Sequence, residues 1–107
     1  MGFITKPVIW TPRALKDLKK VSKFNSKIKG REKAIEIAHK IINAPRILEN
    51  PEYDFQNIGT VDETFSHLKL EYRKIFCEGC KITYREGRTK IYVTRVFDQS
   101  QHPRKNK

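Results

Sequence analysis

The chain has 107 residues, and we expect residues 1–107 to form one domain with a single modest core and a frayed end at 104–107. Lys and Arg outnumber Asp and Glu by 23 to 12 (net charge +11, pI near 9.9), an excess that opposes compaction and indicates an acidic partner: nucleic acid, an anionic membrane or an acidic protein. No apolar run approaches the roughly 20 residues that span a bilayer and no signal-peptide core begins the chain, which excludes those classes and makes the cytoplasm the expected location.

Residues 3–10 (FITKPVIW) are predicted to form a first strand, with Pro7 restricting its early part to a sheet edge. Thr11 and Pro12 then begin a helix, because threonine is a good N-cap and proline is tolerated at the first helical position. This helix is expected to end near residues 24–26. Its buried stripe is Leu15, Leu18 and Val21, and its solvent side is Lys16, Lys19, Lys20 and Lys23.

A second helix is predicted to begin near Gly30 and to be stopped by Pro45, with one more turn over residues 46–50. Because few residues separate the two helices, they should form an antiparallel hairpin. The polar, aperiodic residues 51–66 are predicted to be a loop. The buried stripe of the second helix is expected to be Ala34, Ile35, Ala38, Ile41 and Ile42.

Residues 68–103 are predicted to form three strands joined by tight turns at Glu78-Gly79 and Glu86-Gly87. One face should be apolar: Leu70, Tyr72, Phe76, Ile82, Tyr84, Ile91, Val93 and Phe97. The opposite face and the strand ends should carry Arg73, Lys74, Lys81, Arg85 and Arg95. The predicted fold class is therefore α+β, in the order β-α-α-β-β-β. The helical hairpin should cover the apolar face of a small twisted, mostly antiparallel sheet and leave the basic face to meet an anion.

Three segments together resemble the RelE/ParE superfamily of toxins from bacterial toxin–antitoxin operons. VIWTPRALKDLKKV is similar to the family's first strand and helix, and INAPRILENPE to the end of its second helix. EYRKIFCEGCKITYREGRTKIYVTRVFDQSQHPRK is similar to the ending common among ParE-like members, and it is the most specific of the three. The resemblance implies a type II toxin that is neutralised by a cognate acidic antitoxin. It also implies one of two mechanisms, which the fold cannot separate: inhibition of DNA gyrase, or cleavage of mRNA on the ribosome.

The residues required for ribonuclease chemistry are incomplete in this sequence. Attack of a 2′-hydroxyl on phosphate needs a proton acceptor, a proton donor and positive charge. The resemblance assigns these roles to Arg73, Lys81, Arg95 and His102, but lysine stands at 81 where arginine is typical, and the arginine expected after the fourth strand falls near Gln99. This departure favours the ParE-like function, in which the protein inhibits gyrase and is not an enzyme.

For the gyrase function we expect target binding through the basic side of the third and fourth strands and the segment that follows. The predicted target-binding residues are Arg73, Lys81, Arg85, Arg95, Asp98, Gln99, Gln101 and Arg104. Arg95 has a structural alternative, an internal ion pair with Asp98 or a glutamate. Two other functions stay open: a RelE-like ribosome-dependent mRNA endonuclease, whose partners are the ribosome and mRNA, and a non-toxic basic nucleic-acid-binding domain. No membrane partner is expected.

Cys77 and Cys80 form a C-x-x-C motif in a predicted turn, which raises the possibility of zinc or redox chemistry. Zinc needs four ligands, and no second C-x-x-C or paired histidine is present. Redox C-x-x-C motifs lie at a helix start rather than in a β-turn. We therefore expect two incidental thiols, no metal and no cofactor.

Overall fold

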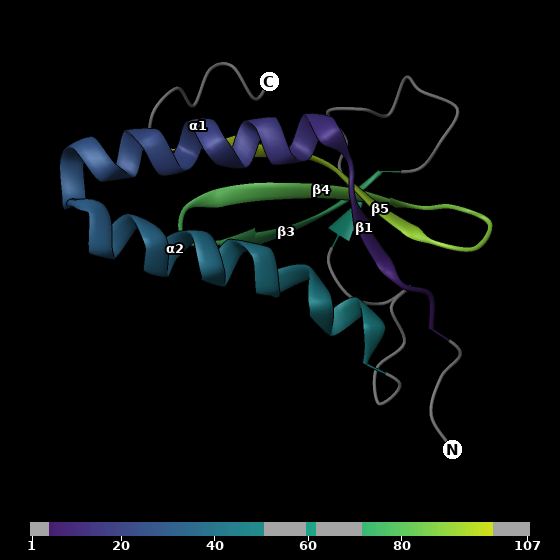
Figure 1. Ribbon diagram of the computed structural model, residues 1–107. Coiled ribbons are helices and arrows are strands. Elements are labelled where there is room, and N and C mark those ends of the chain that lie inside the picture. The colour runs from purple at the N-terminus through teal and green to yellow at the C-terminus, as the bar shows by residue number, and fades with distance from the viewer. Residues whose placement is uncertain (1–4, 51–59, 62–71, 100–107) are drawn as a thin grey trace.

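A computed structural model describes residues 5–50, 60–61 and 72–99 of the chain (Figure 1). The elements in chain order are β1 (Val8–Trp10), α1 (Pro12–Lys29), α2 (Arg31–Asn43), the 3₁₀ helix η1 (Ala44–Glu49), β2 (Thr60–Val61), β3 (Arg73–Cys77), β4 (Cys80–Glu86) and β5 (Ile91–Asp98). In this described part, no helix is both long and apolar enough to cross a membrane.

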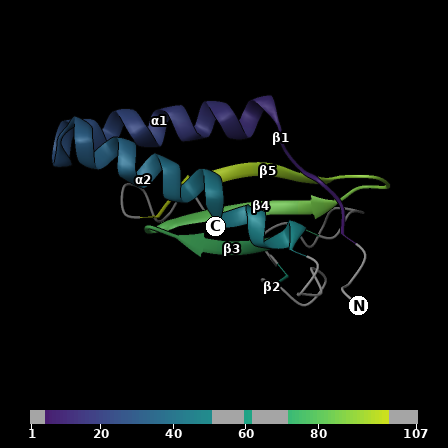
Figure 2. The ribbon, with the colours of Figure 1, turned by 60° about the horizontal axis from the view of Figure 1, so that its bottom comes forward.

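The strands form one five-stranded sheet in the order β1-β5-β4-β3-β2. β1 runs parallel to β5, and the other neighbouring strands are antiparallel. Both long helices lie on the same face of the sheet (Figures 1 and 2). The predicted α+β order and the helical hairpin are confirmed. The structure contains one strand that was not predicted, β2, which lies within the stretch 51–66 that was expected to be a loop.

The first helix begins where the sequence predicts. Thr11 accepts a 3.2 Å hydrogen bond from the backbone N–H of Ala14, and Pro12 is the first helical residue. The same Thr11 hydroxyl lies 2.8 Å from the carbonyl oxygen of Val93 and donates to it, so the cap also attaches the helix to β5.

Two details of α1 differ from the prediction. The helix continues past residues 24–26 to Lys29, because Asn25 is buried within the stripe and does not act as a terminator. Leu15 is half-exposed, because the smaller Ala14 faces the sheet in its place. The buried residues of α1 are Ala14, Asp17, Leu18, Val21 and Asn25.

Gly30 separates the two helices with φ 90° and ψ 161°, a conformation that is essentially restricted to glycine. In α2 the residues that face the sheet are Ala34, Ile37 and Ile41. Ile35 and Ile42, predicted to be buried, lie on the exposed side of this helix. After Asn43 the chain tightens into η1, where Pro45 and Leu48 are buried, so the extra turn predicted over residues 46–50 is present as a 3₁₀ helix.

Glu78 and Gly79 form the turn between β3 and β4, with φ 53° and 75°. A two-residue type I′ turn, whose twist matches that of the flanking strands, requires positive φ at both central residues. The second turn is wider than predicted: Glu86 is still paired with Ile91, and the loop is residues 87–90.

A β-bulge in β5 decides which side chains enter the core. Thr83 pairs with Arg95 and Tyr84 pairs with Val93, so Thr94 has no opposite residue. Val93 therefore faces the helices before the bulge and Val96 after it, and Phe97 points to the opposite face. The prediction that Phe97 joins the apolar face was wrong for this reason. Phe76 was also misplaced, because Ile75 and Cys77 of β3 pack on the core while Phe76 is 60% exposed.

The core is the layer between the hairpin and the sheet. Helix residues Ala14, Leu18, Val21, Ile37 and Ile41 meet sheet residues Cys80, Ile82, Val93 and Val96. Leu48 of η1 packs with Tyr84 and Ile91 in a second, smaller cluster.

Candidate functional site

The face of the sheet turned away from α1 and α2 is called the distal face here. Residues that pair directly across neighbouring strands share a face, so the strand register defines its members. They are Lys74 and Phe76 of β3, Lys81, Thr83 and Arg85 of β4, and Tyr92, Arg95 and Phe97 of β5. Of the cations predicted for target binding, the structure brings Lys81, Arg85 and Arg95 together on it.

Aromatic rings hold the cations of the distal face in place. The Arg85 guanidinium carbon lies 4.7 Å from the centre of the Tyr92 ring. Phe97 is approached by two cations, Arg95 at 4.7 Å and Lys81 Nζ at 5.1 Å. Contacts of this length are favourable cation–π interactions, so the face presents ordered cation–aromatic pairs.

Lys81 differs from the expected exposed cation, since its residue is only 3% exposed. Thr83, next but one along β4, is fully buried, and its hydroxyl lies 2.8 Å from the hydroxyl of Thr94 at the bulge. On this face the centre of β4 is therefore buried from solvent, whereas Arg85 near the end of the strand is partly exposed.

Arg95 is an internal ion-pair partner, as the structural alternative anticipated, but its partner is Asp17 of α1. Arg95 Nε donates to Asp17 Oδ2 at 2.7 Å, and Nη2 lies 3.4 Å from Oδ1. The same Oδ2 accepts the backbone N–H of Val96 at 3.0 Å. Asp17 thus provides a hydrogen-bond acceptor for the backbone of β5 beyond Val93, where the pairing with β1 ends. The sequence carried a signal for this role, because an acid in the buried stripe of a helix requires a partner.

Arg73 does not belong to the distal face, which corrects the prediction. It pairs with Tyr84 across the β3–β4 ladder, and Tyr84 is a core residue. Burial raises the pKa of Tyr84, and a hydrogen bond with Arg73 acts in the opposite direction. Arg73 thus contacts a core residue on the face of the sheet that carries the helices.

The remaining predicted residues lie at or beyond the end of β5. Asp98 is opposite Cys80, and the backbone N–H of Gln99 donates to the carbonyl oxygen of Gly79 at 3.2 Å. Both residues therefore lie beside the β3–β4 turn, at the opposite end of β4 from Arg85. Gln101, His102 and Arg104 lie outside the described residues.

Cys77 and Cys80 are opposite each other across the β3–β4 turn, and both thiols are free. Burial raises the pKa of the Cys80 thiol to about 12, and burial also raises that of Cys77. Raised pKa values disfavour the thiolate that metal binding and disulfide exchange require. No cluster of three or more metal-ligating side chains occurs in residues 5–50, 60–61 and 72–99.

A family model described as the ParE toxin of the type II toxin–antitoxin system parDE matches residues 8–103. The chain belongs to the ParE toxin family. It is thus a toxin component of a type II toxin–antitoxin system. Among solved structures, a chain of the "Chromosomal ParDE TA system from P. aeruginosa" superposes with a TM-score of 0.69 and 20% identity, covering 88% of this toxin and 96% of that chain. No curated protein matches significantly.

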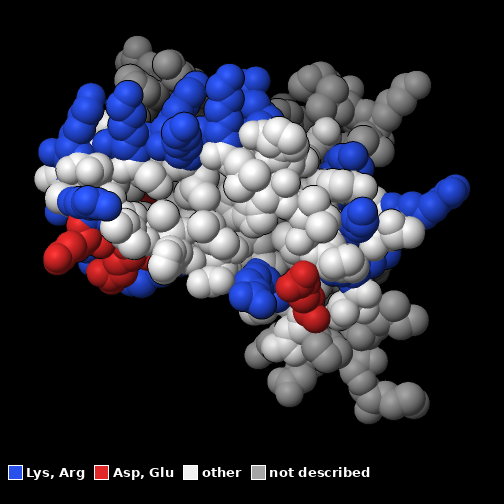
Figure 3. Space-filling model, in the orientation of Figure 1, with Lys and Arg blue, Asp and Glu red and all other residues white. Residues whose placement is uncertain are grey.

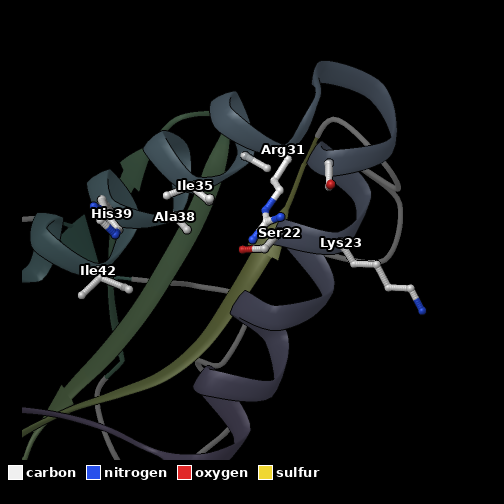
Figure 4. Close-up of a pocket in the computed structure, with 9 residues that line it drawn as sticks. Ser22, Lys23, Arg31, Ile35, Ala38, His39 and Ile42 are labelled. Carbon is white, nitrogen blue, oxygen red and sulfur yellow. The ribbon is translucent and has the colours of Figure 1, made fainter.

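The helical hairpin of this ParE-family toxin bears a groove of about 470 Å³ between α1 and α2 (Figure 4). Its floor is apolar, and Arg31 extends across it from the start of α2 towards Ser22 of α1. Ile35 is 47% exposed and Ile42 is 40% exposed. These two residues, misassigned to the core from sequence, instead line the groove.

A second surface of the toxin is purely cationic. Exposed lysines follow one another along the outer side of α1, and they form a continuous row in the space-filling view (Figure 3). We call Lys16, Lys19, Lys20, Lys23 and Lys27 the α1 lysine row.

Proposed function

We propose that this ParE-family toxin acts on DNA gyrase, stabilising gyrase on cleaved DNA, rather than cutting mRNA. The observation that supports this choice is the ion pair between Arg95 and Asp17. A guanidinium already bound to a carboxylate is poorly placed to stabilise a developing phosphorane. Arg73, a second member of the nuclease set, lies on the face with the helices.

We place target binding on Arg85 and Tyr92 of the distal face and on Asp98 and Gln99 beside the β3–β4 turn. Gln101 and Arg104, which lie outside the described residues, belong to the same proposed surface. Arg85 suits this role because it is half-buried and its guanidinium is oriented by the Tyr92 ring. Lys81 and Arg73 serve it less well, since one is shielded and the other faces the core side. This function requires no cofactor, and its target places the toxin in the cytoplasm.

The test of the target compares two reconstituted reactions with the same purified toxin. Gyrase, supercoiled plasmid and ATP should yield linear DNA after detergent and protease treatment, because trapped gyrase leaves its cleavage product. Ribosomes translating a defined mRNA should show intact transcript by primer extension. Cuts in the ribosomal A site with normal gyrase turnover would instead establish the endonuclease, and neither effect would favour the non-toxic nucleic-acid-binding domain.

We further propose that the cognate antitoxin occupies the groove of the helical hairpin with an acidic amphipathic segment. Ile35 and Ile42 offer apolar anchors about two helical turns apart, and Arg31 and Lys23 supply cations beside them. Such a segment is expected to fold as it binds.

A matched pair of substitutions tests the groove. Ile42→Glu places a carboxylate in the groove, while Ile47→Glu places one at a similarly exposed isoleucine on η1, away from the groove lining. Ile42→Glu should weaken antitoxin binding at least about tenfold in calorimetry, and Ile47→Glu should not. Equal affinities would place the antitoxin elsewhere.

A further inference from the structure

Within the described residues, the lysines of α1 form no ion pair with an acidic side chain, whereas two lysines of α2 do. On α2, Oε1 of Glu36 lies 3.5 Å from Nζ of Lys33 and 3.3 Å from Nζ of Lys40. The same Nζ of Lys40 lies 3.4 Å from Oε1 of Glu78. On α1, the one acidic residue is Asp17, which is buried and held by Arg95. No ion pair to the α1 lysine row occurs in the described part of the chain.

This arrangement works against the helix itself. Lys16 and Lys20, Lys19 and Lys23, and Lys23 and Lys27 are each four residues apart, and like charges at this spacing destabilise a helix by a few tenths of a kcal/mol per pair. The row therefore does not serve the stability of α1. A partner that carries negative charge would remove the repulsion.

The geometry of the row suits a regular polyanion. From Lys16 to Lys27 the helix rises about 16 Å, with one or two lysines in each turn of about 5.4 Å. That length corresponds to the rise of about five nucleotides of one strand in B-form DNA. Lysine is a flexible point charge, so it contacts phosphate without reading sequence.

We propose that the α1 lysine row binds the sugar–phosphate backbone of duplex DNA. The choice of DNA over duplex RNA rests on the proposed function, since gyrase holds DNA at the site where the toxin would act. An acidic peptide is less suited to the row itself, because the apolar anchors that such a peptide needs lie in the groove.

The test uses the antitoxin-free toxin and a fluorescein-labelled 30-base-pair duplex in an anisotropy titration at several salt concentrations. The row variant replaces Lys16, Lys19, Lys20 and Lys27 by Gln, leaving Lys23 because it also lines the groove. The control variant replaces Arg31, Lys33, Lys40 and Arg46 by Gln, so both variants lose four positive charges from exposed helical positions. Circular dichroism verifies that both are folded.

The row variant should reduce the slope of log K against log salt by about 3 to 4, because each phosphate contact contributes about 0.9. The control should change that slope by less than about 1. Equal slopes for the two variants, or no DNA binding by the wild type, would overturn the proposal. Equally tight binding of duplex RNA through the row would overturn the choice of DNA.

The gyrase reaction is run in parallel to separate the two proposals. Wild-type DNA binding that depends on the row, without gyrase trapping, would uphold the row and refute the gyrase target. Gyrase trapping that is identical for wild type and row variant, with no change in DNA affinity, would refute the row alone.

Discussion

The Asp17 carboxylate of α1 accepts a 2.7 Å hydrogen bond from Nε of Arg95 on β5. One acid thereby joins the first helix to the last strand, and it forms an ion pair with a cation of the distal face that the sequence suggested for function. Because Oδ2 also accepts the Val96 N–H, the contact fixes the helix against the backbone as well as against a side chain.

Asp17→Asn should destabilise the toxin by about 1–3 kcal/mol, because the amide carries no charge for the Arg95 guanidinium and its NH2 group would replace the Oδ1 acceptor that now lies 3.4 Å from Nη2. Urea unfolding measures this change. Glu32→Gln, which alters an exposed acid in the first turn of α2, is the control and should stay within about 0.5 kcal/mol. A loss for Asp17→Asn no larger than the control's would show that the ion pair contributes nothing to stability.

Arg85→Ala should lower gyrase-trapped DNA cleavage at least about tenfold, since a buried or ordered arginine is a frequent source of binding energy at interfaces. Stability should change by no more than about 1 kcal/mol, the value of a partly exposed cation–π contact. Arg88→Ala, an exposed arginine in the neighbouring loop, serves as the control and should retain trapping. Loss of trapping in both variants would assign the effect to net charge.

Gly87→Ala should destabilise the β4–β5 hairpin by about 1–3 kcal/mol through overpacking. A Cβ at this position would lie 2.6 Å from Cε2 of Tyr92 and 3.0 Å from the carbonyl oxygen of Lys90. Leucine at position 92 lacks that ring carbon, so adding Tyr92→Leu should recover part of the loss. A double variant less stable than the additive expectation would contradict the proposed clash.

Cys77 should react with iodoacetamide at pH 8 much faster than Cys80, because Cys77 is partly exposed while Cys80 is 1% exposed. The variants Cys80→Ala and Cys77→Ala isolate the two thiols, and mass spectrometry follows their alkylation. In urea the two rates should become equal. Similar rates in the folded protein would mean that the hairpin opens readily.

Stability should also fall at high pH because of Cys80. Its folded pKa of about 12 lies above its ordinary value of 9.0, so the folded state retains the proton that the unfolded state releases. The full stability is present below pH 9 and declines as the pH rises from 9 towards 12. Tyr84, whose pKa is also raised by burial, adds to the decline above pH 10. Flat stability across this window would contradict the burial of these groups.

Local signals in the sequence predicted the elements well. Thr11 and Pro12 mark the start of α1, and the pair Glu78 and Gly79 marks the turn whose positive φ angles the structure confirms. Each of these depends on a few neighbouring residues, and the apolar spacing between such signals predicted the order of the elements. The two long helices and the three last strands could therefore be predicted from the sequence.

Side-chain facing was less predictable, because it depends on distant pairing. Thr94 carries no local mark of a bulge, yet its lack of an opposite residue moves Phe97 off the core face. Asp17 and Arg95 are far apart in the chain, so their contact follows from how α1 lies along β5. The facing of Arg73 and the burial of Lys81 were not predicted for the same reason: burial and register are properties of the assembled sheet.

The hydroxyl of Thr11, which caps α1 and donates to Val93, has a kinetic consequence. Because the helix is attached to the sheet at its first turn, the toxin meets a charged macromolecule with this backbone already ordered. The rate of encounter should then follow diffusion and ionic strength, with no prior folding step on the toxin's side.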